Sequence, residues 1–144
     1  MIDLRILTPL ILFAVSGCTP NQAVPKLQGV TQIRAHVPSV PQLAVDEIDA
    51  VSVPDSQLAQ LSALVTPSEP CMQQIDKREH YLVAIVELFH SDGTKTTVYV
   101  RWTGHNPAAV SLDDEHFFYG GKPEAGDGAV KILQLLMQYH DGTQ

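Results

Sequence analysis

The stretch YLVAIVELFHSDGTKTTVYVRWT, residues 81–103, decides the fold. Residues 81–90 form an apolar run rich in β-branched side chains, and residues 95–103 alternate between apolar and polar side chains. Ser91, Asp92 and Gly93 separate the two runs. Two such runs around a short glycine-containing loop predict a β-hairpin.

The register of this hairpin follows from the length of its loop, because a slip of one residue exchanges the two faces of a strand. A two-residue loop would place Glu87 opposite Val98 in the core, whereas a three-residue loop places Val86 there. An unpaired buried charge is strongly destabilising, so we expect the three-residue loop, with Gly93 at its left-handed position. The same register predicts three further pairs: Ala84 with Val100, Leu82 with Trp102, and Glu87 with Thr97.

The odd-numbered residues of the hairpin form a second face, which is unusually apolar for an exposed surface. This face is predicted to carry Tyr81, Val83, Ile85, Phe89 and Tyr99. A patch of this kind is typically covered, either within the molecule or by a partner. We slightly prefer cover by the preceding proline-rich segment, and we keep the face as a possible partner surface.

On the amino-terminal side of the hairpin, residues 47–53 alternate and predict a strand that Pro54 ends. Leucines at helical spacing over residues 58–65 predict a helix, with Asp55 or Ser56 as its cap. The segment from Pro67 to Arg78 is expected to be a loop.

On the carboxyl-terminal side, residues 116–119 are expected to form a short strand. An apolar stripe over residues 128–140 predicts a final helix that Asp127 caps. The resulting order predicts an α+β domain with a small antiparallel or mixed sheet of three or four strands. Both helices are expected on one face of that sheet.

A short apolar run near the start of the chain ends at a cysteine. Arg5 supplies a positive charge, residues 6–15 are apolar apart from Thr8 and Pro9, and Val15-Ser16-Gly17-Cys18 follows. This is the three-part layout of an export signal, and the run is too short for a comfortable transmembrane helix. The tetrapeptide resembles the lipobox of bacterial lipoproteins.

The resemblance implies that residues 1–17 are a lipoprotein signal peptide, and that the Cys18 thiol receives a diacylglycerol. Cys18 would then become the lipidated N-terminus, and two or three acyl chains would anchor it firmly in a membrane. Thr19 stands where an Asp often signals retention in the inner membrane. We therefore expect a lipid-anchored protein of the cell envelope, at the outer membrane and facing the periplasm. An ordinary secretory signal with an incidental cysteine is the alternative.

Residues 18–44 are predicted to be a lipidated N-terminus and a flexible tether, because prolines recur among Gln, Ser and Asn residues. A short strand over residues 28–37 is the only regular element considered within it, and Arg34 and His36 are expected to be solvated. The domain is then predicted to occupy residues 45–144.

The charge excludes two classes of partner. The chain has 144 residues and a net charge of −7 at pH 7. Sites for nucleic acid are basic, so no nucleic-acid partner is expected. Electrostatic adhesion to anionic lipid is disfavoured for the same reason.

Candidate chemical groups are few. The acidic turn Asp113-Asp114-Glu115-His116 suggests a hard-cation site or an acid–base pair, although a solvated turn is the favoured interpretation. The histidine spacing matches no zinc motif. Cys71 is interpreted as a half-buried structural thiol rather than a nucleophile or a disulfide partner. No catalytic residue, cofactor or metal is predicted.

These observations favour a lipid-anchored envelope protein whose domain has a binding or assembly role, with another envelope protein as a possible partner. One alternative is a small envelope hydrolase that uses His105, Asp113, Asp114 and His116 from the 104–116 loop. Another is an inhibitor or immunity-like module that acts on an exported enzyme. A cleft around the loop residues would favour the hydrolase, whereas a flat apolar patch on the hairpin would favour a binding module.

Overall fold

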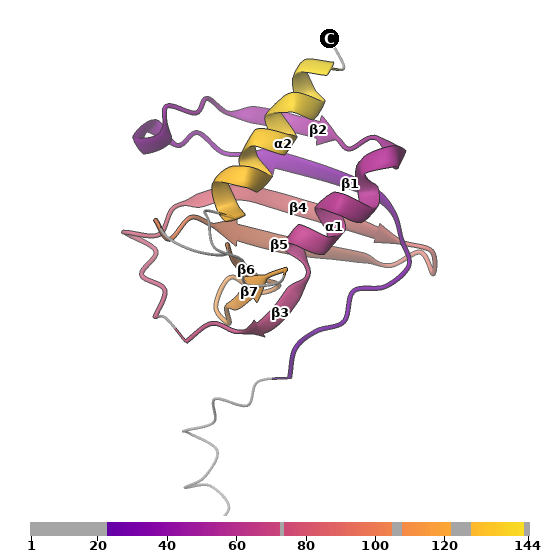
Figure 1. Cartoon of the computed structure of the whole chain (residues 1–144), viewed down its shortest axis with the longest axis horizontal. Coiled ribbons are helices and arrows are strands. Elements are labelled where there is room, and N and C mark those ends of the chain that lie inside the picture. Colours follow the sequence, from indigo (N-terminus) through magenta and orange to yellow (C-terminus); the bar gives the residue numbers. More distant parts are fainter. Residues whose placement is uncertain (1–22, 73, 105–107, 122–127, 143–144) are drawn as a thin grey trace, which may run out of the picture.

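A seven-stranded antiparallel sheet with two α-helices on one face forms the domain (Figure 1). The computed structural model describes residues 23–72, 74–104, 108–121 and 128–142. The strands are β1 (Val30–Val37), β2 (Ile48–Ser52), β3 (Pro67–Pro70), β4 (Leu82–His90), β5 (Lys95–Arg101), β6 (Ala109–Ser111) and β7 (Phe118–Gly120). The helices are α1 (Leu58–Val65) and α2 (Gly128–Gly142), with short 3-10 helices at η2 (Pro41–Leu43) and η3 (Asp55–Gln57). The strand order is β2-β1-β4-β5-β6-β7-β3, and every pair is antiparallel. The α+β class is confirmed, but the expected three or four strands are too few.

The β4–β5 hairpin has the predicted register over most of its length. Val86 lies opposite Val98, Ala84 opposite Val100 and Glu87 opposite Thr97. Gly93 has a φ of +86°, the left-handed conformation that the three-residue loop requires.

The predicted pairing of Leu82 with Trp102 is wrong, because β4 contains a bulge at this end. Leu82 lies opposite Arg101, and Val83 is the extra residue between Leu82 and Ala84. Trp102 instead donates its backbone N–H to the carbonyl oxygen of Tyr81 at 2.8 Å. A bulge inserts one residue and re-aims the side chains around it, which explains why strict alternation fails here.

Strand β1 lies inside the segment that the sequence analysis assigned to the flexible tether, so the predicted domain boundary at residue 45 is wrong. β1 pairs with β2 on one side and with β4 on the other. Ile33 and Val37 are fully buried, and Ala35 between them is buried too. The prolines at positions 25 and 38 flank this strand and leave its backbone donors free to pair.

Two further strands lie in segments that were expected to be loops. β3 lies at the sheet edge beside β7, where its prolines are tolerated because one side of the strand needs no donors. β6 consists of three buried residues between β5 and β7. β7 corresponds to the short strand predicted over residues 116–119, shifted toward the carboxyl terminus.

Both helices cover the same face of the sheet, as Figure 1 shows. α1 contacts β1 and β7, and α2 contacts β2 and β4. α1 buries Leu61 and Val65, while α2 buries Ile132 and Leu136 among others. None of the helices in the described part of the chain has the length and apolar character that crossing a bilayer requires.

The predicted helix caps have different outcomes. η3 occupies Asp55–Gln57, and Gln57 is the N-cap of α1 without a capping side-chain hydrogen bond. The cap predicted at Asp55 or Ser56 is therefore wrong. Asp127, the cap predicted for α2, lies outside the described residues.

Candidate functional site

The sheet face opposite the two helices, here called the open face, is built from β1, β4 and β5. The strand registers place its side chains in three rows that run across these strands. The rows are His36–Ile85–Tyr99, Arg34–Glu87–Thr97 and Gln32–Phe89–Lys95. Their neighbours along each strand point to the helices and form the core, so the open face is a direct consequence of the two-residue period of the strands.

Three of the five residues predicted for a partner surface lie on the open face. Ile85, Phe89 and Tyr99 are half-buried there, and Ile85 lies directly opposite Tyr99. Side chains at directly opposed positions of an antiparallel pair are in contact range. The open face therefore carries an Ile85–Tyr99 pair, and Phe89 lies on the same face two rows away.

The other two predicted residues lie elsewhere. Val83 is fully buried in the core, where the bulge of β4 places it. The ring of Tyr81 stacks on the ring of Trp102, with 5.9 Å between centroids and 14° between planes. Trp102 itself packs against the edge of the core and is half-buried.

Arg34 and Glu87 lie in the row between the Ile85–Tyr99 pair and Phe89. The guanidinium carbon of Arg34 lies 5.7 Å from the ring centroid of Phe89, a cation–π arrangement. Lys95 Nζ donates to Glu87 Oε1 at 2.9 Å. Arg34 was expected to be solvated in the tether, and the short strand considered over residues 28–37 was not joined to the sheet. The alternation of polar and apolar residues over positions 32–37 was the signal that would have found it.

The acidic turn after β6 is organised by Asp113. Its carboxylate accepts hydrogen bonds from Ser111 Oγ, from the backbone N–H groups of Glu115 and His116, and from His116 Nδ1 at 2.6 Å. The bonds from His116 are the main reason that the pKa of Asp113 lies far below its usual value. The same pairing raises the pKa of His116. Asp113 and His116 thus stabilise the turn through each other.

Asp114 points in a different direction. Its carboxylate receives Arg101 Nε at 2.9 Å and Nη2 at 2.8 Å, and Lys77 Nζ at 3.1 Å. These bonds, chiefly that from Arg101, lower the pKa of Asp114. Asp113 and Asp114 therefore serve separate partners and do not converge on one point. His105, the remaining residue of the hydrolase set, lies outside the described residues.

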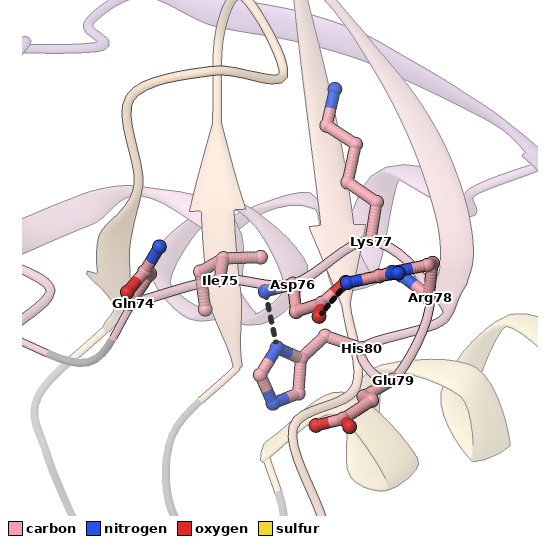
Figure 2. Close-up of a pocket in the computed structure, with 7 residues that line it drawn as sticks. All are labelled: Gln74, Ile75, Asp76, Lys77, Arg78, Glu79 and His80. Carbon is pink, nitrogen blue, oxygen red and sulfur yellow. Dashed lines mark hydrogen bonds and ion pairs between the residues drawn. The ribbon is translucent and has the colours of Figure 1, made fainter.

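A polar hollow of about 580 Å³ lies along residues Gln74 to His80 (Figure 2). The backbone N–H of Asp76 donates to His80 Nδ1 at 2.9 Å, and both carboxylate oxygens of Asp76 bind Arg78. The Arg78 pairing lowers the pKa of Asp76. Lys77 extends away from this group, toward its ion pair with Asp114. The hydrogen bonds among Asp76, Arg78 and His80 hold the loop in shape, and Lys77 is paired with Asp114 outside it.

Cys71 is half-buried, as predicted. Its backbone N–H donates to the carbonyl oxygen of Phe117 at 3.0 Å, which extends the pairing of β3 with β7. Burial raises the pKa of the neighbouring Tyr119, and the Cys71 thiol beside it adds to this effect. The thiol therefore lies in a packed position at the sheet edge.

Among the described residues, two groups bring three possible cation ligands together. Within each group the ligand atoms lie within 4.8 Å of one another. One group is His36, Glu47 and Asp49, and the other is Asp113, Glu115 and His116. The first was not considered in the sequence analysis, because its histidine was assigned to the tether.

Comparisons of the chain with protein-family models, with curated proteins and with solved structures found no match.

Proposed function

We propose that this protein is a lipid-anchored component of the bacterial cell envelope whose domain binds another envelope protein. The binding role rests on the open face, where Ile85, Phe89 and Tyr99 are half-buried on the side of the sheet opposite α1 and α2. The location rests on the tetrapeptide from Val15 to Cys18 at the end of an apolar run.

The open face has the mixed character of a protein interface. Aromatic residues and arginine are enriched at such interfaces, with polar groups at the rim. Tyr99 and Phe89 would supply buried aromatic area, and Arg34 and the Glu87–Lys95 pair would supply charged contacts beside them. If the bound partner is an exported enzyme, the same surface would give the protein an inhibitor or immunity-like role.

The polar clusters of the domain support binding over catalysis. The Asp113–His116 pair closes its own turn, and Asp114 is occupied by Arg101 and Lys77. A hydrolytic site needs a nucleophile or water, a base and an orienting group that share one reacting point. The carboxylates of Asp113 and Asp114 have separate partners instead.

The corrected start of the domain brings it close to the proposed anchor. Val30, the first residue of β1, lies twelve positions after Cys18 in the sequence. An extended chain spans at most about 3.5 Å per residue, so the domain would stay within roughly 40 Å of the membrane surface. A partner would therefore be another membrane protein or a protein held near the bilayer.

Photo-crosslinking in cells tests the binding role. A photoreactive residue at position 97, in the middle row of the open face, should give a crosslinked species in the membrane fraction. The same residue at position 134, on the exposed side of α2, is the control and should give none. Crosslinking from position 134 and not from position 97 would contradict the assignment of the open face. Substituting Ile85 or Tyr99 with serine should weaken the crosslink from position 97.

A further inference from the structure

Three potential metal ligands meet where β1 faces the start of the edge strand β2. His36 is a β1 residue, Asp49 is in β2, and Glu47 directly precedes β2. One ligand atom from each lies within 4.8 Å of the other two. His36 is half-buried and both carboxylates are exposed, so an ion would reach them from solvent.

An irregularity in strand pairing creates this meeting point. Ala35 pairs with Val51 and Val37 pairs with Ile48, so β2 takes three residue steps where β1 takes two. Two residues of β2 therefore lie opposite His36, and a bulge of this kind re-aims the side chains near it. Glu47 and Asp49 are two positions apart in extended chain, so their side chains leave the same side of the backbone.

The backbone fixes which nitrogen of His36 is available. Nδ1 lies 3.3 Å from the carbonyl oxygen of Asp49. A carbonyl oxygen only accepts, so Nδ1 is the protonated nitrogen and the neutral ring keeps its lone pair on Nε2. Metal-binding histidines are commonly oriented by such a bond from the non-ligating nitrogen. Nε2 in turn lies 3.6 Å from Glu47 Oε1, a separation too long for a good hydrogen bond.

The acidic turn offers a contrast. His116 Nδ1 already binds Asp113 Oδ2 at 2.6 Å, and the Asp113 carboxylate accepts three further hydrogen bonds. A cation at that group would have to displace these bonds. The nearest positively charged side chain on the same side of β1 as His36 is that of Arg34. Its guanidinium lies over the Phe89 ring.

We propose that His36 Nε2 and the carboxylates of Glu47 and Asp49 bind one Zn²⁺ ion, with water completing its coordination. One imidazole and two carboxylates form a ligand set that zinc accepts in proteins. The bound ion would join the edge strand β2 to β1. The site shares the row of His36, Ile85 and Tyr99 with the open face, but its ligands do not depend on a partner.

Zinc titration followed by NMR of the histidine side-chain nitrogens tests the site. The full chain is used in detergent with Cys18→Ser and Cys71→Ser, so that no thiol competes for the ion. One equivalent of Zn²⁺ should shift Nε2 of His36 and leave the nitrogens of His116 unchanged. His36→Gln, Glu47→Gln and Asp49→Asn should each weaken the calorimetric affinity by at least about tenfold.

The matched controls are His116→Gln and Glu115→Gln, which alter the other group and should leave the affinity within about twofold of the parent. The β1–β2 backbone resonances report whether each variant keeps its fold. Zinc shifts at His116 in place of His36, an affinity unchanged in all three ligand variants, or no binding at one equivalent would each overturn the proposal.

Discussion

Arg101 and Asp114 form a two-point ion pair at the end of β5, with Nε to Oδ1 at 2.9 Å and Nη2 to Oδ2 at 2.8 Å. The Arg101 side chain is only 8% exposed, and its Nη1 also donates to the carbonyl oxygen of His80. Asp114 has a φ of +57°. One buried guanidinium thus joins the sheet, the 74–80 loop and the acidic turn.

Replacing Asp114 with asparagine should destabilise the domain by about 2–3 kcal/mol, because it leaves a buried arginine without its counter-charge. Asparagine tolerates the left-handed backbone conformation, so the loss would report the ion pair and not strain. Urea denaturation measures the change. Asp76→Asn is the control, because the Asp76–Arg78 pair is exposed and such pairs contribute little. An equal loss in both variants would contradict the special role of Arg101.

Ile33→Ala should lower the free energy of unfolding by about 3 kcal/mol, since Ile33 is fully buried in the core beneath the helices. Gln32→Ala, on the exposed side of the same strand, should change it by less than about 0.5 kcal/mol. Thermal or urea unfolding of the two variants checks both values. An Ile33→Ala variant with an unchanged free energy of unfolding would contradict the assignment of residues 30–37 to the folded domain.

Gly93→Ala should destabilise the hairpin by about 1 kcal/mol. The added methyl group meets no atom within 4 Å, so the cost comes from the left-handed φ of +86° alone. Gly93→Asn should lose less, because asparagine adopts this conformation more readily. Equal stability of alanine and glycine at this position, measured by urea denaturation, would argue against the three-residue loop.

The acidic turn should make stability depend on pH through His116. The pKa of His116 is raised in the folded protein by Asp113, so its stabilising contribution is complete below the ordinary value of about 6.5. That contribution is lost as the pH rises through the folded pKa. NMR titration should therefore place the midpoint of His116 above the ordinary value, and Asp113→Asn should move it back. A midpoint that Asp113→Asn leaves unchanged would show that the pair does not form.

The hairpin was predictable because only the three-residue loop keeps the Glu87 carboxylate out of the core, and this fixed the register of the two strands. The bulge at Val83 was not predictable, because every residue around it is apolar and an inserted residue therefore does not change the sequence pattern. A short strand over residues 28–37 was considered and corresponds to β1, but the prolines on both sides led to its assignment to the tether, although Ile33, Ala35 and Val37 alternate with polar residues. β3 and β6 were missed because short strands depend on tertiary pairing more than on local propensity.

The predicted partner surface was partly recovered. Parity along β4 and β5 placed Ile85, Phe89 and Tyr99 on one face, but Arg34 and His36 join that face only through the long-range pairing of β1 with β4. The group formed by His36, Glu47 and Asp49 depends on the irregular pairing of β1 with β2. The spacing of these residues along the sequence does not predict that pairing.

Mass spectrometry of the protein purified from bacterial membranes tests the central claim most directly. The account predicts an amino-terminal peptide that begins at Cys18 and carries a diacylglycerol on its sulfur, and a Cys18→Ser variant without any acyl group. A wild-type peptide that still contains residues 1–17, or that begins elsewhere with an unmodified Cys18 thiol, would contradict it.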